Sequence, residues 1–289
     1  MTGLAITAWS AVSSHGVGAA ALRPGAQAPD LRELLGGKGT KSFDRLTLLA
    51  LAAVGELTDL PPDTAIALAT SGSVRSIMDF SRQSLTAAKP THVDPSLFPN
   101  TVMNRPASQC AIRYGLRGPN TTIGGGRAGF LQALGFGRHL IKVGRADRAV
   151  VGGVEEDAAG DPAAEGCAVF VVEPAGPAAL ADVLAVEFGV HDDKADSVGL
   201  TVARALDNAG VTADDVSVAS ASSVTDSVVL TGLFGDRVTV VPIAGLRGAA
   251  YAGFQVAEAL QDKGIAVVNA MDRNGVTACA VLNVHGGGR

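Results

Sequence analysis

The sequence predicts an α/β protein in which helices cover largely buried sheets. Short apolar segments of strand length alternate with segments whose apolar residues recur at helical spacing, and this alternation runs along most of the chain. Many of the strand segments are continuously apolar, which is typical of sheets that are buried on both faces. With 289 residues, of which 47% are hydrophobic, the chain can bury a large core as one domain or as two halves.

The first part of the chain follows this alternation. A strand is predicted at residues 4–12, and the Gly- and Pro-rich residues 24–39 are predicted to form a loop. Residues 44–57 carry apolar side chains at helical spacing, and Pro61 and Pro62 end that helix. A short apolar strand is then predicted at residues 64–70, followed by a turn at residues 71–73.

The last hundred or so residues repeat the same types of element. The sequence predicts strands at residues 182–188, 216–222 and 237–243 and helices at residues 198–209, 226–234 and 253–263.

Two similar strand pairs indicate a duplication. The segment 148–156 is followed by a loop and the apolar segment 167–173, and the segment 265–272 is followed by a loop and the apolar segment 279–284. Each pair comes after a helix, so we expect two similar halves, residues 1–175 and residues 176–289, packed as one unit. Chance similarity between two buried hairpins is the alternative.

Composition excludes several classes of function. The net charge of −5 and the scattered Lys and Arg residues argue against nucleic-acid binding. Cys110, Cys167 and Cys279 are too few and too far apart for a disulfide framework or a zinc site, so we expect no metal. No targeting sequence stands out, and no apolar run approaches the roughly 20 residues that span a bilayer. We therefore expect a cytoplasmic protein without a membrane segment.

The segment 97–156 contains the most informative feature. It predicts a strand, a tight glycine turn and a helix, which is the geometry that presents a catalytic nucleophile. Arg127 stands where the nucleophile is expected. A guanidinium has five donors, no acceptor and a pKa above about 12, so Arg127 cannot attack a carbonyl carbon.

The same turn also satisfies a dinucleotide-binding pattern. Gly124, Gly126 and Gly129 match G-x-G-x-x-G before a helix, and Glu155 follows the next predicted strand. The preceding strand is short and polar, and Glu155 comes 26 positions after Gly129 rather than about 20. A dinucleotide-dependent oxidoreductase is therefore a weak alternative.

The central segment resembles the ketosynthase family of the thiolase superfamily, the condensing enzymes of fatty-acid and polyketide synthesis. The resemblance rests on FPNT at 98–101, GLRGP at 115–119, GRAD at 144–147 and GGVE at 152–155, and it extends more weakly over the whole chain. It implies a thiolase-like fold, with two βαβαβαββ halves in an αβαβα layered core.

The resemblance also shows what the chain lacks. The family's acyl-carrying cysteine aligns with Arg127, its second histidine with Arg247 and its lysine with Pro242. The window of the first histidine, residues 218–223, contains none of the five histidines. Condensation needs a nucleophile and acid–base groups, so we expect no catalytic residue, and we expect no cofactor.

These losses are similar to those of the chain length factor, an inactive homologue that pairs with an active ketosynthase in type II polyketide systems. The sequence 127–132 resembles that homologue's pattern with arginine in place of glutamine, and the loops after Glu156 and Gly189 are short for the family. The resemblance implies a heterodimer that meets an acyl carrier protein, and the FPNT and GPNTT motifs favour a reduced or polyene product. A malonyl-acyl-carrier-protein decarboxylase that supplies primers is the enzymatic alternative.

In such a heterodimer the segment 97–112 lies at the interface. We expect the side chains of this segment to line a shared tunnel that limits chain length, or else simply to pack the interface: Phe98, Thr101, Val102, Met103, Asn104 and Gln109. Asn104 and Gln109 are expected to fix the loop by hydrogen bonds rather than to touch substrate. Arg127 is expected to pair with a carboxylate of the partner or of this chain, because a buried unpaired guanidinium is costly.

Overall fold

The duplication predicted from the sequence is visible in the order of the strands. The computed structural model describes residues 3–23, 28–240, 246 and 248–286. Its strands are β1 Leu4–Ser13, β2 Gly16–Val17, β3 Ala65–Thr70, β4 Asn120–Gly124, β5 Ala149–Glu155, β6 Gly166–Pro174, β7 Ala181–Gly189, β8 Val216–Ala221, β9 Val238–Val240, β10 Gly264–Met271 and β11 Thr277–Val284. The first half has the order β4-β3-β5-β6-β1, and the second half has the matching order β9-β8-β10-β11-β7.

The two halves also share the direction of every strand pair. In the first half β3 runs parallel to β4 and β5, while β6 runs antiparallel to β5 and β1. In the second half β8 runs parallel to β9 and β10, while β11 runs antiparallel to β10 and β7. A short antiparallel contact, from Leu4↔Val183 to Ile6↔Ala181, joins the two halves through β1 and β7. The duplicated α/β architecture is thus confirmed, whereas a boundary at residues 175 and 176 stays a prediction.

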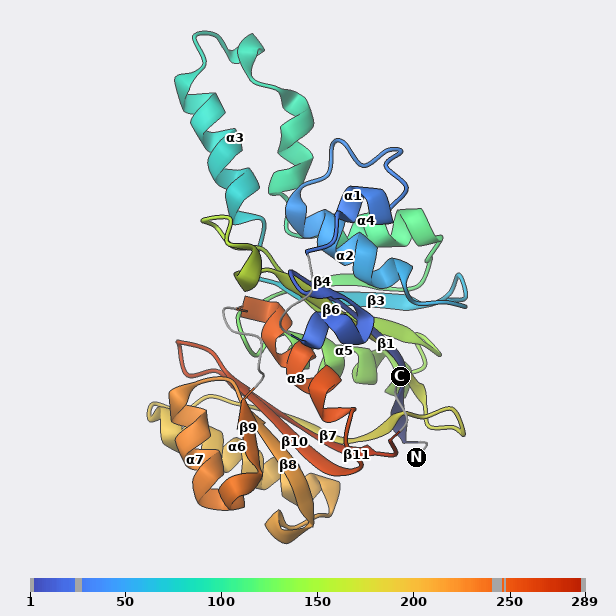
Figure 1. Cartoon of the computed structure of the whole chain (residues 1–289), viewed down its shortest axis with the longest axis vertical. Coiled ribbons are helices and arrows are strands. Elements are labelled where there is room, and N and C mark those ends of the chain that lie inside the picture. Colours follow the sequence, from blue (N-terminus) through green and yellow to red (C-terminus); the bar gives the residue numbers. More distant parts are fainter. Residues whose placement is uncertain (1–2, 24–27, 241–245, 247, 287–289) are drawn as a thin grey trace.

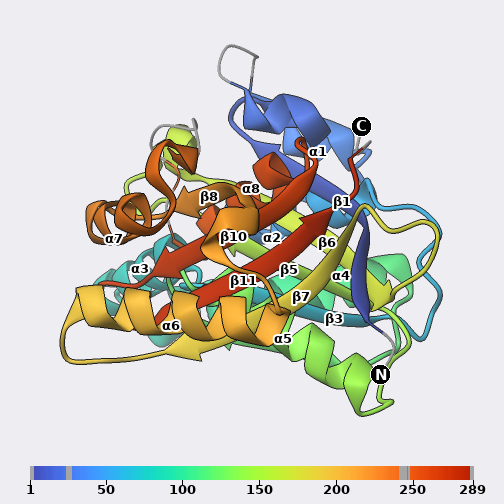
Figure 2. The same cartoon turned by 90° about the horizontal axis from the view of Figure 1, so that it is seen from below.

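The helices and the two halves of the sheet alternate as five layers (Figure 1). Their bounds are α1 Leu31–Leu34, α2 Arg45–Gly55, α3 Val74–Thr86, α4 Arg105–Tyr114, α5 Gly129–Lys142, α6 Lys194–Ala209, α7 Val224–Phe234 and α8 Tyr251–Ala259. Helices α5 and α8 lie between the two halves of the sheet, α2 and α4 cover the first half, and α6 and α7 cover the second half (Figures 1 and 2). This is the αβαβα arrangement that the resemblance implies.

Alternation along the strands explains how both faces of each half are buried. On β3, Ala67 packs in the central layer, whereas Ile66 and Leu68 pack against α2 and α4. On β10, Val268 faces the central layer and Val267 faces α6 and α7. Because successive side chains of a strand point to opposite faces, continuously apolar strands place one apolar set on each face.

Local signals set where several helices begin and end. The Asp44 carboxylate accepts a hydrogen bond from the Thr47 backbone N–H at 2.9 Å and caps α2. Asp193 caps α6 in the same way, and Gly210 ends α6 with a left-handed φ of 68°. The predicted helices 44–57 and 198–209 are therefore confirmed with shifts of a few residues at their ends.

Several expectations differ from the structure. The predicted loop 24–39 contains the one-turn helix α1, and Asp30 caps it by accepting from two backbone N–H groups. The predicted helix 253–263 begins at Tyr251 and ends at Ala259, since the chain must turn before Gly264, whose φ of 121° opens β10. The predicted strand 237–243 is described only as β9, and residues 241–243 lie outside the described part.

Helix α3 and the 3-10 helix η3 (Pro95–Thr101) form a projection that the sequence did not predict. No residue of α3 is buried, and Figure 1 shows the segment standing away from the layers. We call residues 74–103 the arm. The rings of Phe80 and Phe98 meet at 5.7 Å between centroids, so the two limbs of the arm contact each other.

Candidate functional site

The turn between β4 and α5 places Arg127 where the sequence predicted it. The Gly125 N–H donates to the Thr70 carbonyl at 3.1 Å at the end of β3, and the Gly129 N–H donates to the Gly126 carbonyl at 2.9 Å. A side chain at Gly129 would lie 3.1 Å from the Ala69 methyl and 3.2 Å from the Ala249 methyl. The start of α5 is therefore packed tightly, and the backbone turn presents Arg127 at the carboxyl ends of the strands.

Arg127 has no carboxylate partner within 4.0 Å in the part of the chain that the structure describes. Its Nη1 donates to the Ser222 carbonyl oxygen at 2.6 Å, and its guanidinium carbon lies 5.7 Å from the centre of the Tyr251 ring. The expected ion pair is therefore not formed within the described part of this chain, and pairing with a carboxylate of a partner subunit stays a prediction. A carbonyl and an aromatic face satisfy the half-buried guanidinium in part, and one carbonyl bond leaves most of its N–H donors unused.

The geometry argues against a dinucleotide at this turn. The Asp272 carboxylate accepts from the Ala128 N–H at 3.3 Å, and a side chain at Gly126 would lie 2.5 Å from the same Asp272 oxygen. The N-terminus of α5, where a pyrophosphate would bind, is therefore already faced by an anion. A pyrophosphate would be repelled there.

Residues 218–223, the region where the family has its first histidine, lead into a buried cap at the start of α7. Asp226 is fully buried and accepts from the Ser222 N–H and Oγ, both at 2.8 Å, and from the N–H and Oγ of Ser223. Asn269 Nδ2 also donates to it at 3.4 Å. These hydrogen bonds fix the loop after β8. The loop contains no histidine. Pro242 and Arg247, which align with the family's lysine and second histidine, lie outside the described residues.

The cysteines of the chain are far from a reactive state. Cys110, Cys167 and Cys279 are all buried, and burial raises the pKa of each thiol well above its ordinary value. A thiol with a raised pKa holds little thiolate at neutral pH, and the thiolate is the nucleophile. The three cysteines therefore serve packing.

Two cavities meet at Arg127, and their charges are opposite. One has a volume of about 690 Å³ and lies between the loop after β8, the start of α7 and the residues that follow β10; we call it the β8–α7 cavity. Arg127, Lys194 and Arg273 line it with one carboxylate, Asp272. The other, which we call the acidic cavity, has a volume of about 490 Å³. Among their described lining residues, neither cavity has a cysteine or a histidine.

Four carboxylates line the acidic cavity. Two of them belong to Glu155, the last residue of β5, and to Glu156, which follows it. Glu155 accepts from the Ala249 N–H at 2.8 Å and from Ser71 Oγ at 2.9 Å, and burial raises the pKa of its carboxyl group. Burial, together with the nearby charge of Asp44, raises the pKa of Glu156 to about 7. Asp157 and Asp272 complete the set, against the cations Arg127 and Arg273.

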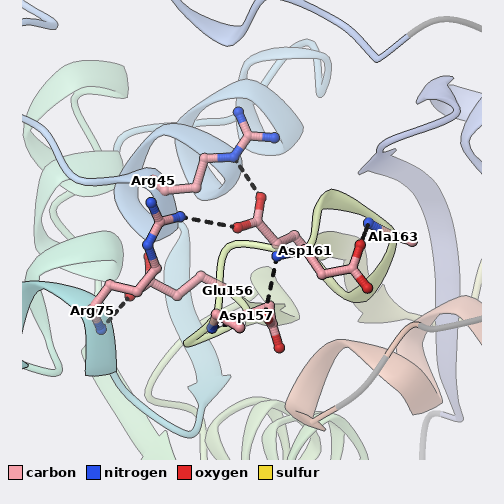
Figure 3. A network of polar contacts seen from close by, with 8 residues as sticks. Arg45, Arg75, Glu156, Asp157, Asp161 and Ala163 are labelled. Atoms are coloured by element: carbon pink, nitrogen blue, oxygen red, sulfur yellow. Dashed lines mark hydrogen bonds and ion pairs between the residues drawn. The ribbon is translucent and has the colours of Figure 1, made fainter.

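An ion-pair cluster holds the short segment between β5 and β6. Glu165 is 2% exposed and pairs with Arg45 Nε at 2.7 Å and with Arg75 Nη1 at 3.4 Å. Figure 3 shows Arg45 from α2 and Arg75 from α3 converging on the segment that carries Glu156 and Asp157. The shortened loop is therefore tied to α2 and to the base of the arm.

The predicted tunnel residues lie on the arm and beside the turn. Phe98, Val102 and Met103 are exposed, and Thr101 Oγ1 donates to the Phe98 carbonyl at 2.7 Å. The Met103 sulfur lies 3.4 Å from the point that a side chain at Gly124 would reach, so Met103 contacts the end of β4 close to Arg127. The structure thus brings one of these residues next to the turn and carries Phe98 out along the arm.

Asn104 and Gln109 do not fix this loop by side-chain hydrogen bonds. No such bond joins either side chain to the described residues, and Asn104 precedes α4 without capping it. Asn100 Nδ2 and Arg105 Nη2 do so instead, since both donate to the Ser42 carbonyl, at 3.1 and 3.2 Å. The sequence did offer a signal for Asn100, which belongs to the FPNT motif.

Sequence reasoning also missed Lys194, Arg273 and the carboxylates of the acidic cavity other than Glu155, because these come from separate segments that only the fold brings together.

In the described part of the chain no helix has the length and apolarity to cross a bilayer. No group of three or more His, Cys, Asp or Glu side chains with the geometry of a metal site occurs among the described residues.

Comparison with known proteins matches this chain to a ketoacyl-synthase family model and to solved ketosynthase structures. The profile of the beta-ketoacyl synthase N-terminal domain matches residues 38–183, about half of the chain. A solved structure of the ishigamide ketosynthase/chain length factor is 34% identical, with a TM-score of 0.85, over 98% of this chain and 100% of that chain. A ketosynthase in complex with its chain length factor from Xenorhabdus doucetiae shares the fold, at 14% identity and a TM-score of 0.74, over 98% of each chain.

A curated relative matches over a shorter stretch. The 3-oxoacyl-[acyl-carrier-protein] synthase 2 of Vibrio cholerae serotype O1 is 34% identical over 80 residues, which are 28% of this chain and 19% of that protein. The match therefore spans about a fifth of the length of the curated relative.

Proposed function

Because the chain belongs to the beta-ketoacyl synthase family, we propose that it is the non-catalytic chain length factor of a type II polyketide synthase. In this role it pairs with an active ketosynthase in the cytoplasm, stabilises it and shapes the tunnel that holds the growing acyl chain. The acyl carrier protein reaches the chain through that complex.

The observation that carries the proposal is Arg127 at the nucleophile position of an otherwise intact framework. The turn between β4 and α5 keeps its tight packing, yet the residue that it presents has no lone pair to attack a thioester. No thiol or imidazole lines either cavity in the described part of the chain. Hydroxyl groups do line the β8–α7 cavity, but the described lining residues include no imidazole that could activate one of them for acyl transfer.

The arm supports the proposed heterodimer. It exposes a set of large apolar side chains on α3 and on the residues before α4: Val74, Ile77, Met78, Leu85, Phe98, Val102 and Met103. A helix without a buried face does not gain its stability from packing within this chain. Large apolar side chains exposed on one projecting segment favour a protein interface, and an active ketosynthase is the partner that the family match favours.

Co-expression with an active ketosynthase, followed by size-exclusion chromatography, tests the pairing. We expect the two chains to elute together, and we expect Met78→Lys, which puts a charge on the arm, to abolish co-elution. Leu200→Lys is the matched control, since Leu200 is also an exposed apolar residue on a helix (56% exposed against 49% for Met78) but lies on α6. A wild-type chain that stays monomeric beside the ketosynthase would overturn the proposal.

The tunnel residues and the product class belong to the same proposal. Met103 and the apolar arm residues would limit the acyl chain by steric exclusion at the interface, and the FPNT and GPNTT motifs favour a reduced or polyene chain. Adding a methylene to a filled pocket costs on the order of 1–3 kcal/mol, which is enough to set a length limit.

A malonyl-acyl-carrier-protein decarboxylase is the second candidate, because the unused donors of Arg127 can hold a carboxylate. Incubation of the purified chain with malonyl-acyl carrier protein, without a partner, separates the two functions. The chain length factor proposal expects no release of carbon dioxide above the background of the carrier protein alone. Turnover by the isolated chain would favour the decarboxylase.

A further inference from the structure

The described lining of the β8–α7 cavity has three cationic side chains and one carboxylate, so it carries an excess of positive charge. Arg127, Lys194 and Arg273 line it, and none of the three has a carboxylate within 4.0 Å among the described residues. Asp272 is the single carboxylate of its described lining, and it accepts from the Ala128 N–H. A cavity lined by one sign of charge focuses the field and concentrates ions of the opposite sign.

The donors that face this cavity suit an oxyanion. A guanidinium presents its N–H groups in a planar fork that matches a carboxylate or a phosphate. One donor of Arg127 binds the Ser222 carbonyl, and the others can bind a ligand. Val224 and Thr225, the first residues of α7, also line the cavity, but the buried Asp226 carboxylate caps this helix, so the donors for an anion are those of the cationic side chains.

The rest of the described lining is mixed: Ser222, Ser223, Thr225 and Ser227 contribute hydroxyl groups, and four residues are apolar. Val224 and Val228 are 83% and 68% exposed, and Ala221 and Met271 line the cavity beside them. A volume of about 690 Å³ holds more than a bare ion. The cavity therefore combines a cationic wall with an apolar wall, as a ligand with an anionic head and a short apolar chain requires.

The acidic cavity fixes the side from which an anion can approach Arg127. Glu155, Glu156, Asp157 and Asp272 line that second cavity, and each would repel an anion when it is ionised; burial raises the pKa of Glu155 and of Glu156, so this repulsion grows as the pH rises. Only the β8–α7 side offers Arg127 together with a second and third cation and a single carboxylate among the described lining residues. We propose that the β8–α7 cavity binds an oxyanion, a carboxylate or a phosphate carried on a short apolar chain, with Arg127 as its central ligand.

This site goes beyond the proposed partner function, because it lies within one chain and needs no ketosynthase. Calorimetric titration of the full chain alone with hexanoate, with inorganic phosphate and with the neutral hexanamide tests it. We expect at least one of the two anions to bind, with an affinity that falls as sodium chloride is raised, and we expect hexanamide not to bind. Hexanoate alone identifies a carboxylate site, and phosphate alone identifies a site for phosphate esters.

Two variants and a control make the test specific. Arg127→Gln keeps an amide donor for the Ser222 carbonyl but removes the charge, and we expect it to weaken anion binding by about tenfold or more, as loss of a charge-assisted hydrogen bond does. Arg273→Gln changes an exposed residue of the same cavity and is expected to weaken binding without affecting folding. Arg32→Gln is the matched control, since Arg32 also donates to a backbone carbonyl, that of Phe43, and lies outside the cavity.

The proposal is overturned if neither anion binds, if hexanamide binds as well as hexanoate, or if Arg127→Gln and Arg273→Gln both bind the anion as the wild-type chain does. None of these results depends on whether the chain pairs with a ketosynthase, so failure here is distinct from failure of the partner proposal.

Discussion

Arg127 shows how one substitution changes the chemistry of a turn and leaves its backbone in place. The residues that shape the turn are Gly126 and Gly129, and both are held by close contacts to Asp272, Ala69 and Ala249. Arg127 itself contributes one hydrogen bond to the Ser222 carbonyl and a contact with Tyr251. The backbone geometry and the reacting group are thus set by different residues, so the framework persists without a nucleophile.

Glu156 is expected to make the stability of the fold depend on pH. Folding raises the pKa of Glu156 from its ordinary value of 4.5 to about 7, mainly by burial, so the folded state favours the neutral carboxyl group. The stability gained in this way is complete below pH 4.5 and is lost as the pH rises to about 7. Glu156→Gln should therefore raise the free energy of unfolding at pH 8 by about 1–3 kcal/mol and flatten its decline from pH 5 to pH 8. Urea unfolding at several pH values measures both effects.

Glu165→Gln is the control for Glu156→Gln and should act in the opposite direction. Glu165 is ion-paired with Arg45 and Arg75, so loss of its charge should destabilise the fold at pH 8. The cost should be about 1–2 kcal/mol, below that of a fully buried pair, because both arginines are partly exposed and water can solvate them. Equal pH dependence in the wild-type chain and in Glu156→Gln would contradict the account of Glu156.

At the scale of elements, the central layer depends on a glycine that lets two backbones meet. A side chain at Gly153 on β5 would clash with the backbone carbonyl of Ala249 in η7 (Gly248–Ala250), the 3-10 helix that leads into α8. Backbone cannot move aside as a flexible side chain can, so the clash must be relieved by a shift of α8. The packing of β5 against η7 is therefore intolerant of even one methyl group.

Gly153→Ala should destabilise the fold by about 3 kcal/mol or more, or prevent soluble expression. The matched control is Gly199→Ala on α6, where an added methyl meets nothing within 4 Å. Because alanine favours a helix over glycine, this control should stabilise the fold by about 0.5–1 kcal/mol. Thermal unfolding of the two variants checks the contrast, and a Gly153→Ala variant as stable as the wild-type chain would refute the described packing.

The elements that the sequence predicted are those that pack within the chain. Apolar runs such as residues 265–272 and capped helices such as the one that begins at Arg45 carry their own signal, because burial and capping leave a pattern in the sequence. Helix α3 left no such signal, since none of its residues is buried in this chain. Its apolar residues are interpretable only once the structure shows them exposed together.

The candidate site was predictable in the same uneven way. Arg127 could be placed from the strand–turn–helix pattern, and the family motifs identified the missing thiol and imidazoles. The partners of Arg127 could not be predicted, because Ser222 and Tyr251 come from distant segments and are brought to the turn only by the packing of the second half on the first. An ion pair within this chain was therefore expected but does not occur among the described residues, and one with a partner subunit stays a prediction.

At the scale of the whole molecule, the two halves bury three apolar layers but leave the arm uncovered. The central cluster is shared by α5, α8 and strands from both halves, and the outer clusters lie under α2 and α6. The arm remains outside these layers, with Leu85 86% exposed near its tip. The proposed pairing with a ketosynthase would cover the arm.

The account predicts that the size of the residue at position 103 sets product length. Met103 lies against the end of β4, where a tunnel along the interface would end, so Met103→Ala should allow the pair to make chains longer by at least one extension unit. Each methylene excluded by a filled pocket is worth about 1–3 kcal/mol, so the shift should dominate the product mixture. Mass spectrometry of the released products measures it, with Leu200→Ala as the control. An unchanged length distribution would remove Met103 from the tunnel.

The central claim is that a condensing-enzyme framework works here without a reacting group of its own. Intact-protein mass spectrometry of the co-purified pair, after incubation with an acyl-carrier-protein substrate, tests it most directly. We predict that the ketosynthase gains the mass of the acyl group and that this chain keeps its unmodified mass. An acyl group bound covalently to this chain would contradict the account.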